Sequence, residues 1–194
     1  MNWINKYFED LKEKINPEEL SAWISEFSEI IKNCDGKILF AGNGASSVIG
    51  EHAHLDIMNQ LGITTINISN GSYITAASND FGYENIFKRY IDLNVTDKDV
   101  VVLISSSGRS KNILNAAEGA KKKGATIVTF SGFSKDNPLR KLGNLNLWVD
   151  SSVYNIVESI HNAWIVSVID YIISENPDNV GIHGIEFEIK GIKQ

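Results

Sequence analysis

The sequence predicts an α/β protein with a doubly wound, five-stranded parallel β-sheet that is covered by helices on both faces. Two observations carry this prediction. From Gly36 onward, short apolar runs alternate with segments of helical periodicity, which is the order of elements in a parallel sheet with crossover helices. The runs are also apolar on consecutive residues, as expected for strands buried on both faces.

Two amphipathic helices are predicted before the sheet begins. Apolar side chains recur at helical spacing from Trp3 to Ile15 and again from Leu20 to Ile31. Pro17 separates the two patterns. It suits the first position of the second helix, because its fixed φ matches a helix and its missing N–H would have no partner there.

Five strands are expected on the apolar runs, which read KILFA, TTINIS, DVVVLIS, ATIVTF and LNLWV. Helical patterns separate them over 46–60, 83–92 and 110–123. The common strand order for such a sheet is 2-1-3-4-5, which makes the first and third strands neighbours. The loops that follow these two strands would then meet at one edge of the sheet.

A last long helix is predicted from about Val153 to Ile173, and it is apolar on more than one face. One sheet face does not need such breadth, so this helix and the two N-terminal helices are predicted to form a subunit interface. The chain length of 194 residues fits one domain, assigned to 1–175. The tail over 176–194 alternates in IEFEI but is given no place in the fold.

Composition narrows the classes of partner. The formal net charge of -6 gives no general attraction to nucleic acid or to an acidic membrane surface. The single cysteine, Cys34, excludes a disulfide within the chain, and no apolar run in the sequence reaches the roughly 20 residues that span a bilayer. The N-terminal segment mixes charges into an amphipathic pattern, unlike a secretory signal. A soluble, cytoplasmic protein is expected.

The run ISSSGRS over 104–110 follows the third predicted strand and precedes a helical pattern. Serine hydroxyls and bare backbone N–H groups at a helix N-terminus suit an anion, most simply a phosphate. The simpler alternative is that Ser107 or Ser110 caps the helix. One serine would suffice for that role, so the sequence favours the anion site.

The run GNGASS over 42–47 follows the first predicted strand. It lacks the third glycine and the downstream acidic residue of a dinucleotide fingerprint, so no nucleotide cofactor is expected. The Asn43 amide can offer both a donor and an acceptor to a hydroxylated ligand, and Ser46 or Ser47 can cap the next helix.

Three motifs, GNGAS, SNDFGYENIFKRY and ISSSGRS, together resemble the sugar isomerase (SIS) domain family, and within it the sedoheptulose 7-phosphate isomerase group. The likeness runs from about residue 3 to 173. It implies a homotetramer with active sites at subunit interfaces. It also implies a bound phosphosugar, held by Ser105, Ser106, Ser107 and Ser110, with Asn43, Ser46 and Asp80 facing the sugar.

The catalytic pattern of the family is altered in this chain. The resemblance places His52 and Asp56 at the positions of a His–Glu pair, and Glu158 and His161 at those of a glutamine and a first histidine. A second, catalytic histidine follows in the isomerases, but NAWIV over 162–166 holds no titratable group. The four remaining residues are the candidate acids and bases for isomerisation, which needs both.

The same four residues could hold zinc, which accepts two imidazoles and two carboxylates. A histidine paired with a nearby carboxylate, without a metal, is the open alternative. Two functions also stay open. One is an aldose–ketose isomerase of sedoheptulose 7-phosphate that serves surface-polysaccharide heptose synthesis. The other is a non-catalytic module that senses a phosphosugar or docks onto a protein such as a replication initiator.

Overall fold

The computed structural model describes residues 2–15 and 17–175, so the tail over 176–194 and the question of its place lie outside the described residues. The described chain forms one five-stranded sheet in the order β2-β1-β3-β4-β5, with every neighbouring pair parallel. The predicted fold class and strand order are confirmed. The strands are β1 (Ile38–Gly42), β2 (Thr65–Asn67), β3 (Val100–Ser105), β4 (Thr126–Ser131) and β5 (Leu145–Trp148).

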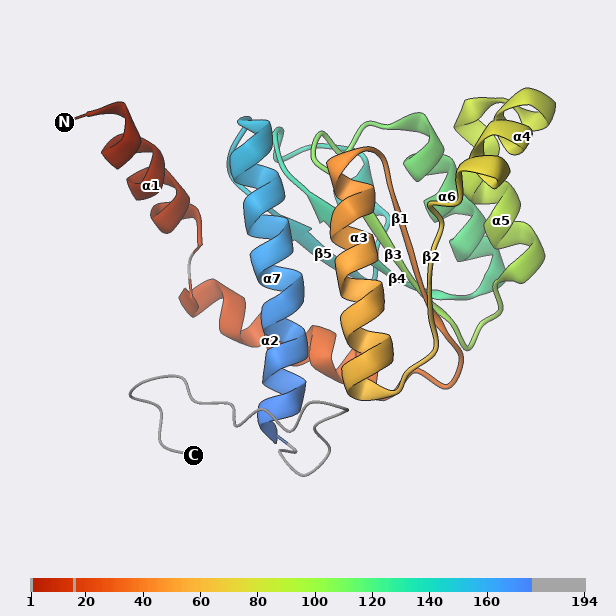
Figure 1. Cartoon of the computed structure of the whole chain (residues 1–194), viewed down its shortest axis with the longest axis horizontal. Coiled ribbons are helices and arrows are strands. Elements are labelled where there is room, and N and C mark those ends of the chain that lie inside the picture. The colour runs from red at the N-terminus through yellow and green to blue at the C-terminus, as the bar shows by residue number, and fades with distance from the viewer. Residues whose placement is uncertain (1, 16, 176–194) are drawn as a thin grey trace.

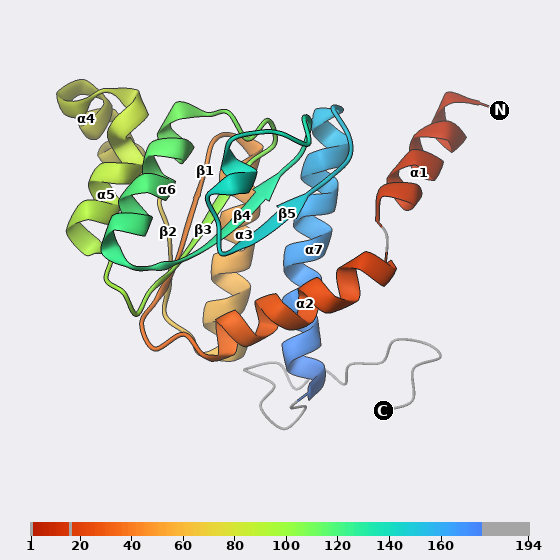
Figure 2. The same ribbon diagram turned by 180° about the vertical axis from the view of Figure 1, so that it is seen from behind.

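Helices cover both faces of the sheet (Figures 1 and 2). The α-helices are α1 (Trp3–Lys14), α2 (Pro17–Lys32), α3 (Ala45–Asp56), α4 (Gly71–Phe81), α5 (Ile86–Asn94), α6 (Lys111–Lys123) and α7 (Tyr154–Glu175). Short turns of other helix types are η1 (Ile57–Leu61), η2 (Tyr83–Asn85) and η3 (Leu139–Lys141). Pro17 is the first residue of α2, as predicted.

Alternate side chains of the central strands pack into two separate cores, because successive side chains of a strand point to opposite faces of the sheet. On one face, Phe40, Val102 and Phe130 pack with α2, α3 and α7. On the other face, Leu39 and Leu103 pack with α4, α5 and α6. The middle strands β1 and β3 are buried at every position, which accounts for their unbroken apolar sequence.

Helix α7 is the main helix of the first core and lies beside α3, with both helices running in the same direction (Figures 1 and 2). By length and composition alone α7 could cross a membrane, but 56% of its most apolar window is buried inside the fold. Its broad apolar surface is therefore largely taken up by the sheet, α2 and α3. This packing accounts for part of the breadth that the sequence analysis assigned to a subunit interface, and the interface itself stays a prediction.

Helix α4 was not predicted, because its sequence GSYITAASNDF has little helical periodicity and buries only Ala77. Its start is set locally instead. The Asn70 side chain accepts a hydrogen bond from the backbone N–H of Tyr73 at 3.0 Å, which is a standard N-cap.

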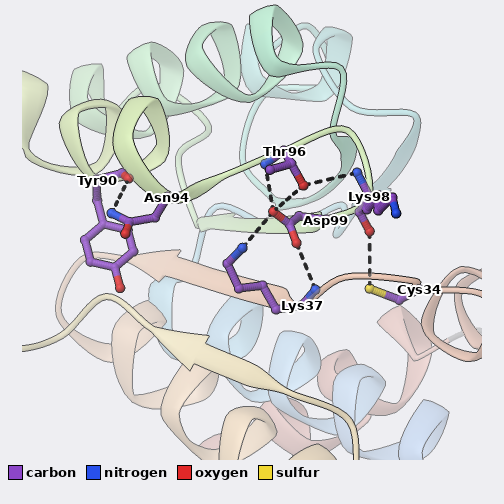
Figure 3. A network of polar contacts seen from close by, with 7 residues as sticks. All are labelled: Cys34, Lys37, Tyr90, Asn94, Thr96, Lys98 and Asp99. Atoms are coloured by element: carbon purple, nitrogen blue, oxygen red, sulfur yellow. Dashed lines mark hydrogen bonds and ion pairs between the residues drawn. The ribbon is translucent and has the colours of Figure 1, made fainter.

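A polar network joins β1 and β3 at the end where both strands begin (Figure 3). The Asp99 carboxylate is 2% exposed and accepts from the Lys37 ammonium at 2.8 Å and from the Lys37 backbone N–H at 2.9 Å. It also accepts from the backbone N–H of Thr96 at 2.7 Å. Gly36 permits this approach, since a Cβ there would lie 2.3 Å from Asp99 Oδ1.

Candidate active site

The two loops predicted to meet do leave from neighbouring strands. Strands β1 and β3 pair in register, with Gly42 opposite Ile104 at the end of the ladder. The loop between β1 and α3, residues 43 and 44, is called the first loop, and the serine loop is residues 105–110. The first loop therefore starts beside the serine loop. This edge is the carboxyl end of the sheet, at the point where the strand order reverses, which is where open α/β sheets bind ligands.

The first loop turns tightly into α3. Gly44 has φ of 55°, in the left-handed region that favours glycine. Ser46 is buried and its backbone N–H bonds to the Asn43 carbonyl at 3.1 Å. The loop thus presents the Asn43 side chain near the end of β3.

The serine loop holds four hydroxyl groups at the start of α6. Ser105 and Ser106 are buried, and the Ser105 hydroxyl donates to Ser110 Oγ at 3.2 Å. Ser110 occupies the N-cap position of α6, yet its side chain makes no capping bond. Ser107 Oγ accepts from the backbone N–H of Arg109 at 3.3 Å. The capping alternative therefore does not explain Ser110, and the backbone N–H groups of the first turn of α6 lie beside these hydroxyls.

A neighbouring loop fixes the shape of the serine loop. Gly108 has φ of 61°, and a Cβ there would lie 2.0 Å from Asn137 Oδ1. The Asn137 side chain is fully buried and donates to Ser131 Oγ at 3.1 Å, so it cannot move aside freely. Close backbone packing at Gly108 therefore locks the loop that follows β3 against the loop that follows β4.

Three polar side chains join the two loops to the segment after α4. Asn43 and Asn112 exchange amide hydrogen bonds, with Asn43 Nδ2 donating at 3.0 Å and Asn112 Nδ2 donating back at 2.8 Å. The Tyr83 hydroxyl donates to Asn43 Oδ1 at 2.8 Å. Asn112 is buried, so the pair forms a fixed link between the first loop and the start of α6.

Asp80, predicted to face the sugar, lies near the end of α4 and is exposed. Its Oδ1 accepts from the Asn79 side chain at 2.8 Å. An exposed carboxylate can accept further hydrogen bonds, and the role of Asp80 toward the sugar stays a prediction.

His52 and Asp56 form a pair on α3, with His52 Nε2 3.2 Å from Asp56 Oδ2. His52 Nδ1 also lies 3.3 Å from Oδ1 of Asn162 on α7. Since the two helices run in parallel, one further turn along each places Asp56 level with Val166. Burial raises the pKa of the Asp170 carboxyl on α7, and the charge of Asp56 raises it further.

Glu158 lies on α7 beside the serine loop. The Ser106 hydroxyl donates to Glu158 Oε1 at 3.3 Å. This contact places a carboxylate next to the predicted phosphate loop. The catalytic role of Glu158 stays a prediction.

His161 is buried in the core beside the end of β4. It is 0% exposed and packs against the rings of Phe130 and Trp164. Its Nε2 lies 3.0 Å from the Ser131 carbonyl oxygen, so this nitrogen carries the proton and donates. Burial lowers the pKa of His161 to about 4, although the Ser131 carbonyl opposes the shift. His161 is therefore a neutral core histidine at pH 7.

The four residues assigned to zinc do not come together within one chain. Over residues 2–15 and 17–175, no group of three His, Cys, Asp or Glu side chains is placed to hold a metal ion. The buried ring of His161 explains part of this, since its Nε2 already binds a backbone carbonyl. His161 and Glu158 lie within one turn of α7, but His161 faces the sheet and Glu158 faces the serine loop.

Sequence reasoning missed three residues that complete the polar side of the site. Asn112 is two residues after the serine loop, and Tyr83 lies inside the motif NDFGYENIF. Asn162 is four residues after Glu158, so the two share a helix face. All three lie close to residues that the sequence analysis had already selected. Their side chains are uncharged amides and a phenol, which in a sequence look the same whether they line a site or lie on the surface.

The family model of the SIS domain matches residues 3–132, which is more than half of the chain. The chain belongs to the SIS domain family. The matched residues include the first loop, Tyr83 and the serine loop. The match ends just after β4, so α7 with Glu158 and His161 lies beyond it.

This SIS domain is similar to curated proteins named phosphoheptose isomerase. The one from Sulfurimonas denitrificans is 32% identical over 170 residues, covering 81% of this chain and 85% of its own. The one from Histophilus somni is 41% identical over 102 residues, and that match spans about half of each chain, 50% and 52%. The solved phosphoheptose isomerase from Francisella tularensis has a TM-score of 0.79 at 26% identity, covering 87% of this chain and 95% of its own.

Proposed function

We propose that this protein is an aldose–ketose isomerase of sedoheptulose 7-phosphate. The observation that carries the proposal is the Glu158 carboxylate, 3.3 Å from a hydroxyl of the serine loop, which puts a proton acceptor beside a site suited to phosphate. The similarity to phosphoheptose isomerases supports this substrate class. It favours an enzyme over a non-catalytic sensing or docking module.

The serine loop would hold the phosphate through hydroxyl groups and the N–H groups at the start of α6. The sugar would then extend toward Asn43 and Asp80. In aldose–ketose exchange a base removes a proton from the carbon next to the carbonyl, and an acid serves the neighbouring oxygens. Glu158 is the candidate base, and the His52–Asp56 pair on the facing helix is the candidate partner in proton transfer. No step through a metal is derived, because the four residues do not form a metal site within the described chain.

The serine loop is tested by removing one hydroxyl. Ser107→Ala is expected to weaken binding of sedoheptulose 7-phosphate by roughly three- to tenfold, the effect of one lost hydrogen bond. Isothermal titration calorimetry measures it. Ser25→Ala, on the outer side of α2, is the matched control and should bind like the unchanged protein. Equal affinity in both variants would remove the phosphate role of this loop.

The oligomeric state is a second expectation. Helix α1 has no buried residue, and Trp3, Ile4 and Phe8 are all more than half exposed at 74%, 53% and 61%. Val48 on α3 is also exposed, at 68%. Apolar faces of this kind support a homotetramer, since monomers rarely leave them in water. Multi-angle light scattering at micromolar concentration should give four times the mass of one chain. A stable monomer would contradict it.

A cytoplasmic role in the synthesis of surface-polysaccharide heptose is the setting we propose for this activity. The acidic composition and the lone cysteine, which is free, support it.

A further inference from the structure

Tyr83 lies in the motif NDFGYENIF and has no role in the proposed reaction so far. Its side chain is 53% exposed, so it is not held in place by core packing. Its hydroxyl nevertheless makes a well-placed bond of 2.8 Å to Asn43 Oδ1. An exposed phenol that reaches a polar group of the site points to a role toward the ligand.

The hydrogen bonds of Asn43 leave it with a single kind of free group. Its Oδ1 accepts from two donors, the Asn112 amide and the Tyr83 hydroxyl, both at 2.8 Å. A carbonyl oxygen has two lone pairs, so this acceptor is saturated. Its Nδ2 carries two hydrogens, and one is used on Asn112 Oδ1. Within the described residues, the second N–H of Asn43 donates to no protein group, so Asn43 can offer a ligand only a donor.

The amide pair alone does not fix this orientation. Turning both the Asn43 and the Asn112 amide over would exchange nitrogen and oxygen on each side and keep two bonds between them. The Tyr83 hydroxyl breaks this symmetry. A phenol is a better hydrogen-bond donor than acceptor, so it favours the state in which the Asn43 oxygen faces it.

We propose that Tyr83 is a positioning residue, which orients the Asn43 amide so that its free N–H donates to an acceptor oxygen of the bound sugar. The inference rests on the proposed function, because it assumes a phosphosugar in this site. It narrows what the site accepts: the sugar must place an oxygen with a free lone pair, either a carbonyl or a hydroxyl, beside Asn43. This contact would be made with the sugar chain, because the phosphate would be held at the serine loop.

The experiment compares Tyr83→Phe with Tyr73→Phe. Tyr73 is a matched control, because its hydroxyl also donates one 2.8 Å bond, to the Ile86 carbonyl, and does not contact Asn43. Sedoheptulose 7-phosphate and inorganic phosphate are titrated separately by calorimetry. We expect Tyr83→Phe to bind the sugar phosphate roughly three- to tenfold more weakly, with phosphate affinity unchanged. Tyr73→Phe should match the unchanged protein for both ligands.

A second readout needs no ligand. In a nitrogen-15 NMR spectrum, the side-chain amide signal of Asn43 should shift in Tyr83→Phe and stay in place in Tyr73→Phe. Unchanged sugar affinity in Tyr83→Phe would overturn the proposal, and so would an equal loss of sugar and phosphate binding, which indicates a disturbed loop. If the unchanged protein binds phosphate but not the sugar phosphate, the proposed function itself fails. A shifted Asn43 signal would still show the hydrogen bond, but not a role for it in binding that sugar.

Discussion

Glu158→Gln is expected to reduce proton exchange at the sugar carbon next to the carbonyl by at least about a hundredfold, the usual scale of a lost acid or base. The amide has nearly the same shape as the carboxylate, and its oxygen can still accept from the Ser106 hydroxyl. Phosphosugar binding should therefore survive within about twofold, since no hydrogen bond is lost. The proton acceptor is lost while the ligand stays in place.

Solvent deuterium incorporation into sedoheptulose 7-phosphate measures this exchange even when net turnover is slow. Asp56→Asn should give a similar loss, because it removes the carboxylate that pairs with His52. Glu118→Gln, exposed on α6, has the same change in chemistry and should exchange like the unchanged protein. The isomerase proposal would be contradicted if the unchanged protein binds the sugar but exchanges no more deuterium than an enzyme-free control.

Asp99→Asn is expected to lower the free energy of unfolding by about 3 kcal/mol, at the low end of what breaking a buried ion pair costs. The substituted amide cannot accept all the bonds of the carboxylate. It would also turn an N–H toward donors such as the Thr96 backbone. The Lys37 ammonium would lose its partner while its side chain stays 24% exposed. Guanidinium unfolding at pH 7 measures the change, with the exposed neighbour Asp97→Asn as control.

The pH dependence of this effect has a definite sign. Burial alone would raise the pKa of the Asp99 carboxyl, but the Lys37 side chain and the backbone N–H groups of Thr96 and Lys37 outweigh it, so the pKa is lowered. A carboxyl with a lowered pKa in the folded state stabilises fully above its unfolded value of about 4, and loses this effect as the pH falls through the folded value. The gap in stability between the unchanged protein and Asp99→Asn should shrink below about pH 4. A gap that stays constant from pH 7 into that range would rule out the ion pair as its cause.

The sheet could be predicted because its central strands are apolar on consecutive residues, as in Val100 to Ile104. The two loops could be placed together because parallel strands end at the same edge. Helix α4 could not be predicted, because it buries a single alanine and starts from a local cap at Asn70. A helix with so little periodic apolar surface looks like a loop in the sequence.

The candidate site was harder to predict than the sheet. The family resemblance grouped Glu158 with His161, and residues three apart on a helix lie near one face. The difference of about 60° between them nevertheless directs Glu158 toward the serine loop and His161 into the core. Whether a histidine ligates a metal or fills a core depends on what lies across from it. For His161 that is Phe130 and the Ser131 carbonyl, which sequence spacing along α7 does not reveal.

The network of Lys37 and Asp99 lies at one end of β1 and β3, and the first loop and the serine loop lie at the other end of the same two strands. Because β1 and β3 pair without a bulge from Ile38 opposite Val100 to Gly42 opposite Ile104, the loops leave the sheet at one level. Their starting points stand about 4.8 Å apart, the spacing of neighbouring strands. The backbone thus sets a fixed width at the base of the site. A change in the ligand that this edge of the sheet accepts would then fall on the side chains and on the segments above that base, such as the one that carries Tyr83.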